Sequence, residues 1–135
     1  MRLALDTNIL VRLVLGDHPR LSPAAVALVS GNACMVSTMA LAEMGFVLLS
    51  FYEVTKAELA SCVRKLMDLP QIALENEDRI GEALKAFEGG MDWFDALLWT
   101  ATPLKCTLAS FDRQFAKRAQ KRDWTPKVEL HLPSP

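Results

Sequence analysis

The chain has 135 residues, with fifteen Lys and Arg against sixteen Asp and Glu, which gives a formal net charge of −1. This length allows one domain with its own hydrophobic core and is too short for two ordinary domains. The hydrophobic share of 51% excludes a disordered chain, and the near-neutral charge means that any nucleic-acid binding depends on a local site.

The cysteines and the apolar segments predict a cytoplasmic protein without a membrane span. Cys34, Cys62 and Cys106 are too few and too widely spaced for a disulfide framework or a zinc finger. No secretory signal is expected, because charged residues interrupt the N-terminal apolar run. The longest apolar segment, residues 36–52, is short for a membrane span and contains Glu43.

The first half of the chain predicts short strands that alternate with helices. In chain order, we expect a strand at 3–5, helices at 9–15 and 24–30, a strand at 33–37, helices at 38–52 and 56–67, and a strand at 71–74. Ser22, which precedes Pro23, is expected to cap the second helix. Thr55 and Glu58 have the spacing of a capping box.

The second half continues the same alternation. We expect a helix at 76–87 stopped by Gly89-Gly90, an apolar helix opened by Asp92 and ended or bent by Pro103, a strand at 106–110, a basic helix at 112–121 and a last strand at 128–131. Apolar strands separated by helices predict an α/β fold, a three-layer α/β/α sandwich with a central, mainly parallel sheet of four to five strands. Residues 1–131 are expected to form a single domain, and residues 132–135 a flexible tail.

Four acidic residues occupy positions that are otherwise apolar: Asp6, Glu43, Asp95 and Asp112. Taken singly, each is as readily explained by helix capping or by a satisfied core acid. Taken together, they lie at strand ends or in the first turns of helices that follow strands, which in a parallel sheet is the edge where ligands bind. We therefore expect their carboxylates to converge.

Converging carboxylates without a basic partner repel one another, and a hard divalent cation relieves that repulsion. All-oxygen ligation favours one or two Mg²⁺ or Mn²⁺ ions, and the isolated His18 and His131 disfavour zinc. The chemistry implied is attack of a metal-activated water on a phosphodiester.

The same acids lie in motifs that resemble those of PIN-domain nucleases. These motifs are Asp6-Thr7-Asn8-Ile9-Leu10, Leu41-Ala42-Glu43, Asp92-Trp93-Phe94-Asp95-Ala96-Leu97-Leu98 and Ser110-Phe111-Asp112-Arg113-Gln114-Phe115, in the family's order. Ser110 replaces the usual Thr and keeps the hydroxyl, and Pro103 falls where the family has a longer helix.

In length, the chain is most similar to VapC-type toxins of toxin–antitoxin pairs. That resemblance implies a PIN-like fold and a Mg²⁺- or Mn²⁺-dependent endoribonuclease, with the four acids as catalytic and metal-binding residues. It also implies a homodimer and a small antitoxin protein that covers the acidic site.

Other polar residues near the four acids are candidates for supporting roles. Thr7, Asn8, Ser37, Asp92 and Ser110 are expected to orient carboxylates or phosphate, although capping explains each of them equally well. Asp92 in particular is expected to cap the helix that carries Asp95.

The basic stretch after Asp112 and the neighbouring aromatic residues are ambiguous. Arg113 and Lys117 are candidates for contacts to RNA phosphates, with a solvated helix face as the alternative. Trp93, Phe94 and Trp99 have the spacing of core or dimer-interface residues more than of a base-stacking platform.

Other functions remain open at this stage. They are a non-toxin PIN-domain nuclease of RNA processing, a catalytically weak RNA- or protein-binding module on the same fold, and a phosphatase. The phosphatase is disfavoured because the motif at Asp6 lacks the second Asp of an Asp-x-Asp nucleophile. A phosphorylated receiver is disfavoured because no acidic pair ends the first strand.

Overall fold

The computed structural model describes residues 2–134, so the predicted domain and tail each have one terminal residue outside the described part. The chain divides between Glu77 and Asp78 into two compact units, unit 1 and unit 2, and each is described by itself. In chain order the elements are β1 (Leu3–Ala4), α1 (Thr7–Leu15), α2 (Leu21–Ser30), β2 (Cys34–Val36), α3 (Thr38–Phe51), α4 (Lys56–Asp68), β3 (Ile72–Leu74), α5 (Glu77–Glu88), α6 (Trp93–Ala101), β4 (Leu108–Ser110), α7 (Arg113–Gln120) and β5 (Val128–Leu130).

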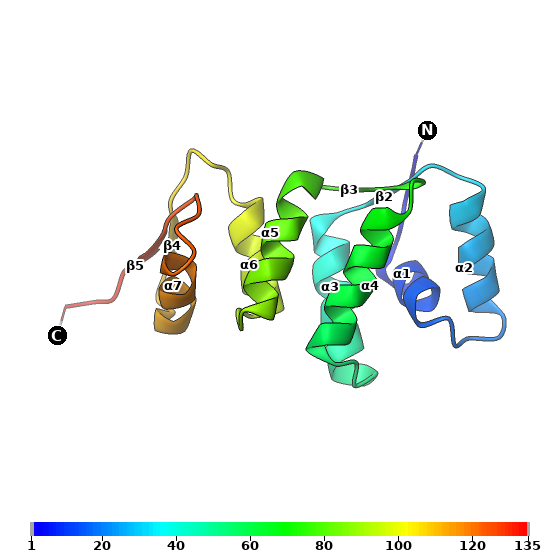
Figure 1. Ribbon diagram of the computed structural model, residues 1–135, viewed down its shortest axis with the longest axis horizontal. Coiled ribbons are helices and arrows are strands. Elements are labelled where there is room, and N and C mark those ends of the chain that lie inside the picture. The colour runs from blue at the N-terminus through cyan, green and yellow to red at the C-terminus, as the bar shows by residue number, and fades with distance from the viewer. Residues whose placement is uncertain (1, 135) are drawn as a thin grey trace. The chain divides into compact units, whose positions relative to one another are not determined.

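Unit 1 is built on a parallel sheet in the order β1-β2-β3, with Leu3 opposite Cys34 and Cys34 opposite Ile72. Parallel neighbours need a crossover, which α1 and α2 provide between β1 and β2, and α3 and α4 between β2 and β3. Figure 1 shows α3 and α4 side by side in this unit, with α1 next to them.

The core of unit 1 comes mainly from α3 and α4. Leu41, Met44 and Leu48 recur every three or four residues along α3 and are fully buried. The start of α4 is fixed by the predicted capping box, because Thr55 accepts from the backbone N–H of Glu58 at 3.1 Å and Glu58 accepts from that of Thr55 at 3.3 Å. This core supports the N-terminal ends of α1 and α3, the helices that follow β1 and β2.

Unit 2 contains three helices and a two-stranded parallel sheet, in which Leu108 of β4 lies opposite Val128 of β5. Figure 1 shows α7 beside these two strands. Trp99 of α6 is fully buried and donates from Nε1 to the carbonyl of Pro126 at 2.7 Å. That bond ties α6 to the segment that leads into β5.

The predicted α/β class and all five expected strands are confirmed, with bounds that differ by one or two residues. In the described chain the strands pair as three and two, since the ladders join β1 to β2, β2 to β3 and β4 to β5. No helix among residues 2–134 combines the length and the apolar character that crossing a bilayer requires.

One local prediction was wrong. Ser22 does not cap α2; its Oγ donates to the carbonyl of Arg12 at 2.7 Å and accepts from the N–H of His18 at 3.1 Å. The helix begins earlier, at Leu21, whose N–H donates to Nδ1 of His18 at 2.9 Å. The imidazole of His18 therefore accepts the hydrogen bond at the start of α2 that was expected to go to the hydroxyl of Ser22.

Candidate active site

Asp6 and Glu43 line one pocket in unit 1. The pocket has a volume of about 220 Å³, and its remaining lining residues are Thr7, Asn8, Val11, Arg12, Val47 and Tyr52. We call it the unit 1 pocket. It brings together residues of α1 and α3, two helices that each follow a strand of the parallel sheet.

Helix caps help to place Asp6 and Glu43 at the carboxyl edge of the unit 1 sheet. Asp6 follows β1 and caps α1, accepting from the N–H of Thr7 at 2.8 Å. Ser37 follows β2 and caps α3, accepting from the N–H of Ala40 at 3.1 Å. Glu43 lies on α3, beyond its first turn. Because β1 and β2 are parallel, both helices start at the carboxyl edge of the sheet.

A hydrogen-bonded arginine forms part of the same pocket. Nη2 of Arg12 donates to the hydroxyl of Tyr52 at 2.7 Å, and Nη1 lies 3.5 Å from a carboxylate oxygen of Asp17. The guanidinium carbon is 5.8 Å from the centre of the Tyr52 ring. The pocket therefore contains a positively charged group as well as its two carboxylates.

In unit 2, Asp95 lies in the first turn of α6, and Asp92 caps that helix by accepting from the N–H of Asp95 at 3.2 Å. This confirms the predicted cap. Burial raises the pKa of Asp95 above its usual value, and the charges of Asp92 and Asp112 raise it further, while Arg118 opposes the shift. The charges of Asp92 and Asp112 thus act on Asp95.

Asp112 begins α7 and has the cap role that was weighed for it. Its side chain accepts from the N–H of Phe115 at 3.1 Å, and its own N–H donates to Oγ of Ser110 at 2.9 Å. The hydroxyl of Ser110 therefore orients the backbone at Asp112. A cap occupies one carboxylate oxygen and leaves the other available to a ligand.

The acids are less buried than their apolar neighbours suggested. Asp6, Glu43 and Asp112 are exposed, and Asp95 is half-buried. Across residues 2–134, no group of three or more His, Cys, Asp or Glu side chains has the proximity needed to hold a metal ion. Convergence of all four carboxylates therefore stays a prediction, and the structure places two of them in the unit 1 pocket and two in unit 2.

Sequence reasoning missed the positive groups beside the acids. Arg12 follows Asn8 by four residues on α1, a spacing that puts both on one helix face and offered a signal. Its partner Tyr52 is forty residues away, beyond the reach of local patterns. Arg118, whose charge acts on Asp95, was treated only as part of a basic stretch. Of the aromatic residues, Trp93 and Trp99 are core residues as expected, whereas Phe94 is half-exposed.

Comparison with protein families decides the fold family. A family model described as PIN domain matches residues 3–121. The chain belongs to the PIN domain family. The matched range contains all four acids, and it covers most of the chain. Neither the comparison with curated proteins nor that with solved structures gives a match.

Membership of the PIN family supports a nuclease, and such nucleases typically use divalent metal ions. The donor chemistry of this chain fits that use. The unit 1 pocket offers two carboxylates, and Mg²⁺ is commonly held by one or two carboxylates together with water and substrate phosphate. In unit 2, neighbouring negative charges help to raise the pKa of Asp95, an effect that a cation would reverse.

Proposed function

We propose that this PIN-domain protein is a Mg²⁺- or Mn²⁺-dependent endoribonuclease and that Asp6, Glu43, Asp95 and Asp112 are its catalytic and metal-binding residues. The observation that carries the proposal is the unit 1 pocket, in which two carboxylates from different helices face the same cavity. Asp6 also caps α1, but that cap occupies one carboxylate oxygen and leaves the other available to a ligand.

Each acid has a role that its local structure supports. Asp6 and Glu43 would hold the metal ion in the unit 1 pocket. Asp95 and Asp112 are the proposed metal ligands of unit 2, with Asp92 and Ser110 fixing the backbones that carry them. A divalent cation, when bound, stabilises the negative charge that develops on a phosphodiester and lowers the pKa of a nearby water.

Thr7, Asn8 and Ser37 have smaller parts in the proposal. Asn8 lines the unit 1 pocket, where its amide is available to a phosphate oxygen. Thr7 is buried beside Asp6, and Ser37 caps α3. These two residues position the helices that carry Asp6 and Glu43.

The direct test is cleavage of RNA by the purified protein with Mg²⁺, with Mn²⁺ and with EDTA, followed by sequencing of the RNA ends. We expect defined internal cuts with either metal and none with EDTA. Asp6→Asn keeps a cap-forming side chain and should lower the cleavage rate by more than about 100-fold. A folded Asp6→Asn protein that cleaves at the wild-type rate would show that the site is misplaced.

We further propose that the nuclease is the toxin of a toxin–antitoxin pair, acting as a cytoplasmic homodimer that a small antitoxin protein inhibits. The support is the ordered set of four motifs within the PIN match. Induced expression in a bacterial host should arrest growth, and Asp6→Asn should relieve the arrest. Growth at the normal rate with active nuclease would instead favour an RNA-processing enzyme.

A further inference from the structure

One cavity of unit 2 is lined by basic residues of α7 and of the two positions that follow it. It has a volume of about 570 Å³ and lies between α7 and the segment that joins α5 to α6. Four cations line it: Lys117, Arg118, Lys121 and Arg122. The other lining residues are Ala86, Gly89, Met91, Gln114 and Trp124. We call it the basic pocket. No acidic residue lines it, although Glu88 is adjacent in sequence to Gly89.

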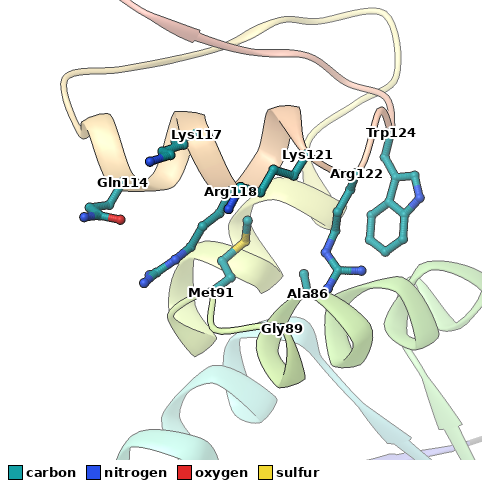
Figure 2. A pocket seen from close by; sticks show the side chains of 9 residues that line it. All are labelled: Ala86, Gly89, Met91, Gln114, Lys117, Arg118, Lys121, Arg122 and Trp124. Atoms are coloured by element: carbon teal, nitrogen blue, oxygen red, sulfur yellow. The ribbon is translucent and has the colours of Figure 1, made fainter.

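The four cations differ in how they are held. Arg122 is fixed in the wall, since it donates to the carbonyl of Lys85 and its guanidinium carbon is 5.0 Å from the centre of the Trp124 ring. Figure 2 shows Arg118 of α7 extending past Met91, and Arg122, which follows the helix, extending toward Ala86 and Gly89. In the part of the chain that the structure describes, none of the four is in an ion pair with a carboxylate.

A cavity with several unneutralised cations and no acid favours a ligand with more than one negative charge. Two arginines and two lysines suit phosphate oxygens, for which guanidinium and ammonium groups are the usual partners. The Trp124 ring is stacked on Trp99 at 5.4 Å and faces Arg122, so it is engaged within the protein. The pocket therefore suits a phosphate chain more than a stacked base.

Arg118 connects this pocket to the candidate active site. It lines the basic pocket, and its charge also acts on Asp95 by opposing the rise in the pKa of that carboxyl. A phosphate chain bound along α7 would therefore lie near one of the proposed catalytic acids. This proximity favours a nucleic acid over an acidic protein segment as the occupant.

We propose that the basic pocket binds the phosphodiester backbone of the RNA substrate, outside the bond that is cut. The inference rests on the proposed function in taking RNA as the ligand. Lys121, the C-cap residue of α7, lies one helical turn beyond Lys117, and both supply mobile charges to successive phosphates. Arg118 and Arg122 line the same cavity, with Arg122 fixed in its wall.

The test is RNA binding without cleavage. A fluorescently labelled single-stranded 12-nucleotide RNA is titrated with protein in EDTA at several salt concentrations, and anisotropy gives Kd and its salt dependence. For the double variant Lys117→Gln/Lys121→Gln, the negative slope of log association constant against log salt should decrease in magnitude by about 1.4, because each lost contact to single-stranded nucleic acid removes about 0.7. At 0.15 M salt, that corresponds to a rise in Kd of about 15-fold.

The matched control is Lys56→Gln/Lys105→Gln, which removes the same charge from exposed lysines outside the pocket. The control should keep the wild-type slope. Equal Kd and slope in the wild type and the Lys117→Gln/Lys121→Gln variant would overturn the proposal. So would binding of a labelled polyglutamate peptide that depends on these two lysines while RNA binding does not.

Failure of this proposal and failure of the proposed function are distinguishable. The titration in EDTA reports on binding alone, whereas the proposed function is tested by metal-dependent cleavage of RNA. An Asp6→Asn protein that binds RNA normally but does not cleave supports both. A wild-type protein that cleaves RNA but binds it independently of Lys117 and Lys121 overturns only the basic pocket.

Discussion

The guanidinium of Arg12 donates a hydrogen bond to the hydroxyl of Tyr52 across forty residues of sequence, and both side chains line the pocket that contains Asp6 and Glu43. The bond joins α1 to the end of α3 at the rim of this pocket. Arg12 also forms a salt bridge with Asp17, and its guanidinium shares the pocket with the two carboxylates. A phosphate group that approaches the pocket therefore meets a donor as well as the proposed metal ligands.

This arrangement predicts that Arg12→Gln weakens RNA binding more than it slows the chemical step. We expect KM for a short RNA to rise by up to about fourfold at 0.15 M salt, the effect of one phosphate contact, with kcat nearly unchanged. Steady-state cleavage in Mg²⁺ measures both constants. Arg20→Gln, which removes an exposed charge from outside this pocket, is the control. An unchanged KM for Arg12→Gln would contradict the assignment.

At Asp112, two substitutions separate helix capping from catalysis. Asp112→Asn keeps a good cap for α7, whereas Asp112→Ala removes it and should lower the free energy of unfolding by about 1 kcal/mol. Both variants should lose most cleavage activity, because both lack the negative charge. Urea unfolding and RNA cleavage are measured on the same preparations. Full activity of a stable Asp112→Asn protein would restrict Asp112 to its cap role.

The raised pKa of Asp95 predicts a pH-dependent stability difference between the wild type and Asp95→Asn. Since the folded protein binds the Asp95 proton more tightly than the unfolded chain, wild-type stability decreases as the pH rises above 3.8, the usual value, through the raised pKa. Without metal, Asp95→Asn should have a higher urea midpoint than the wild type at about pH 7. The two midpoints should draw together at about pH 3. A higher wild-type midpoint at neutral pH would contradict the direction of the shift.

The buried bond from Trp99 to the carbonyl of Pro126 is a test of unit 2 that does not involve activity. Trp99→Phe leaves that carbonyl without its partner and should cost about 1–3 kcal/mol. Leu98→Ala on the same helix is the control, because Leu98 is 53% exposed and its truncation should change the stability by about 0.5 kcal/mol or less. Urea unfolding followed by far-UV circular dichroism compares the two variants.

The three free cysteines should differ in reactivity. Cys106 is exposed, Cys62 is half-buried with its pKa raised chiefly by burial, and Cys34 is buried. Alkylation with iodoacetamide at about pH 8 should label Cys106 first, Cys62 more slowly and Cys34 only after unfolding. Peptide mass spectrometry at several times gives the three rates. Early labelling of Cys34 would show that β2 is more accessible to the reagent than the burial of Cys34 indicates.

Local chemistry could be predicted from the sequence, and contacts between distant residues could not. The cap of Asp92 and the box of Thr55 and Glu58 join residues three positions apart, and both were predicted. The cap of Asp112 has the same spacing and was one of two alternatives for that residue. The Ser22 prediction was wrong because its hydroxyl bonds to a carbonyl ten residues earlier. Periodicity showed the strands but not which strands pair.

In the candidate site, too, some features could be predicted from the sequence and others could not. Lone acids in apolar segments identified Asp6 and Glu43, and the structure places both in one pocket. Their exposure was not foreseen, because hydrophobic neighbours in sequence do not lie around the carboxylate in space. The charge of Arg118 acts on Asp95 through the tertiary structure, which no spacing in the sequence encodes.

Gly89, in the wall of the basic pocket, restricts which side chains can occupy position 122. A Cβ at this position would overlap the guanidinium of Arg122 and approach the carbonyl of Lys85 to 3.3 Å. A larger residue at 89 therefore requires either that the Arg122 guanidinium move from this position or that the side chain at 122 be shorter. Among homologues that retain this pocket, positions 89 and 122 should covary, with glycine accompanying arginine, and drift at one should be constrained by the other.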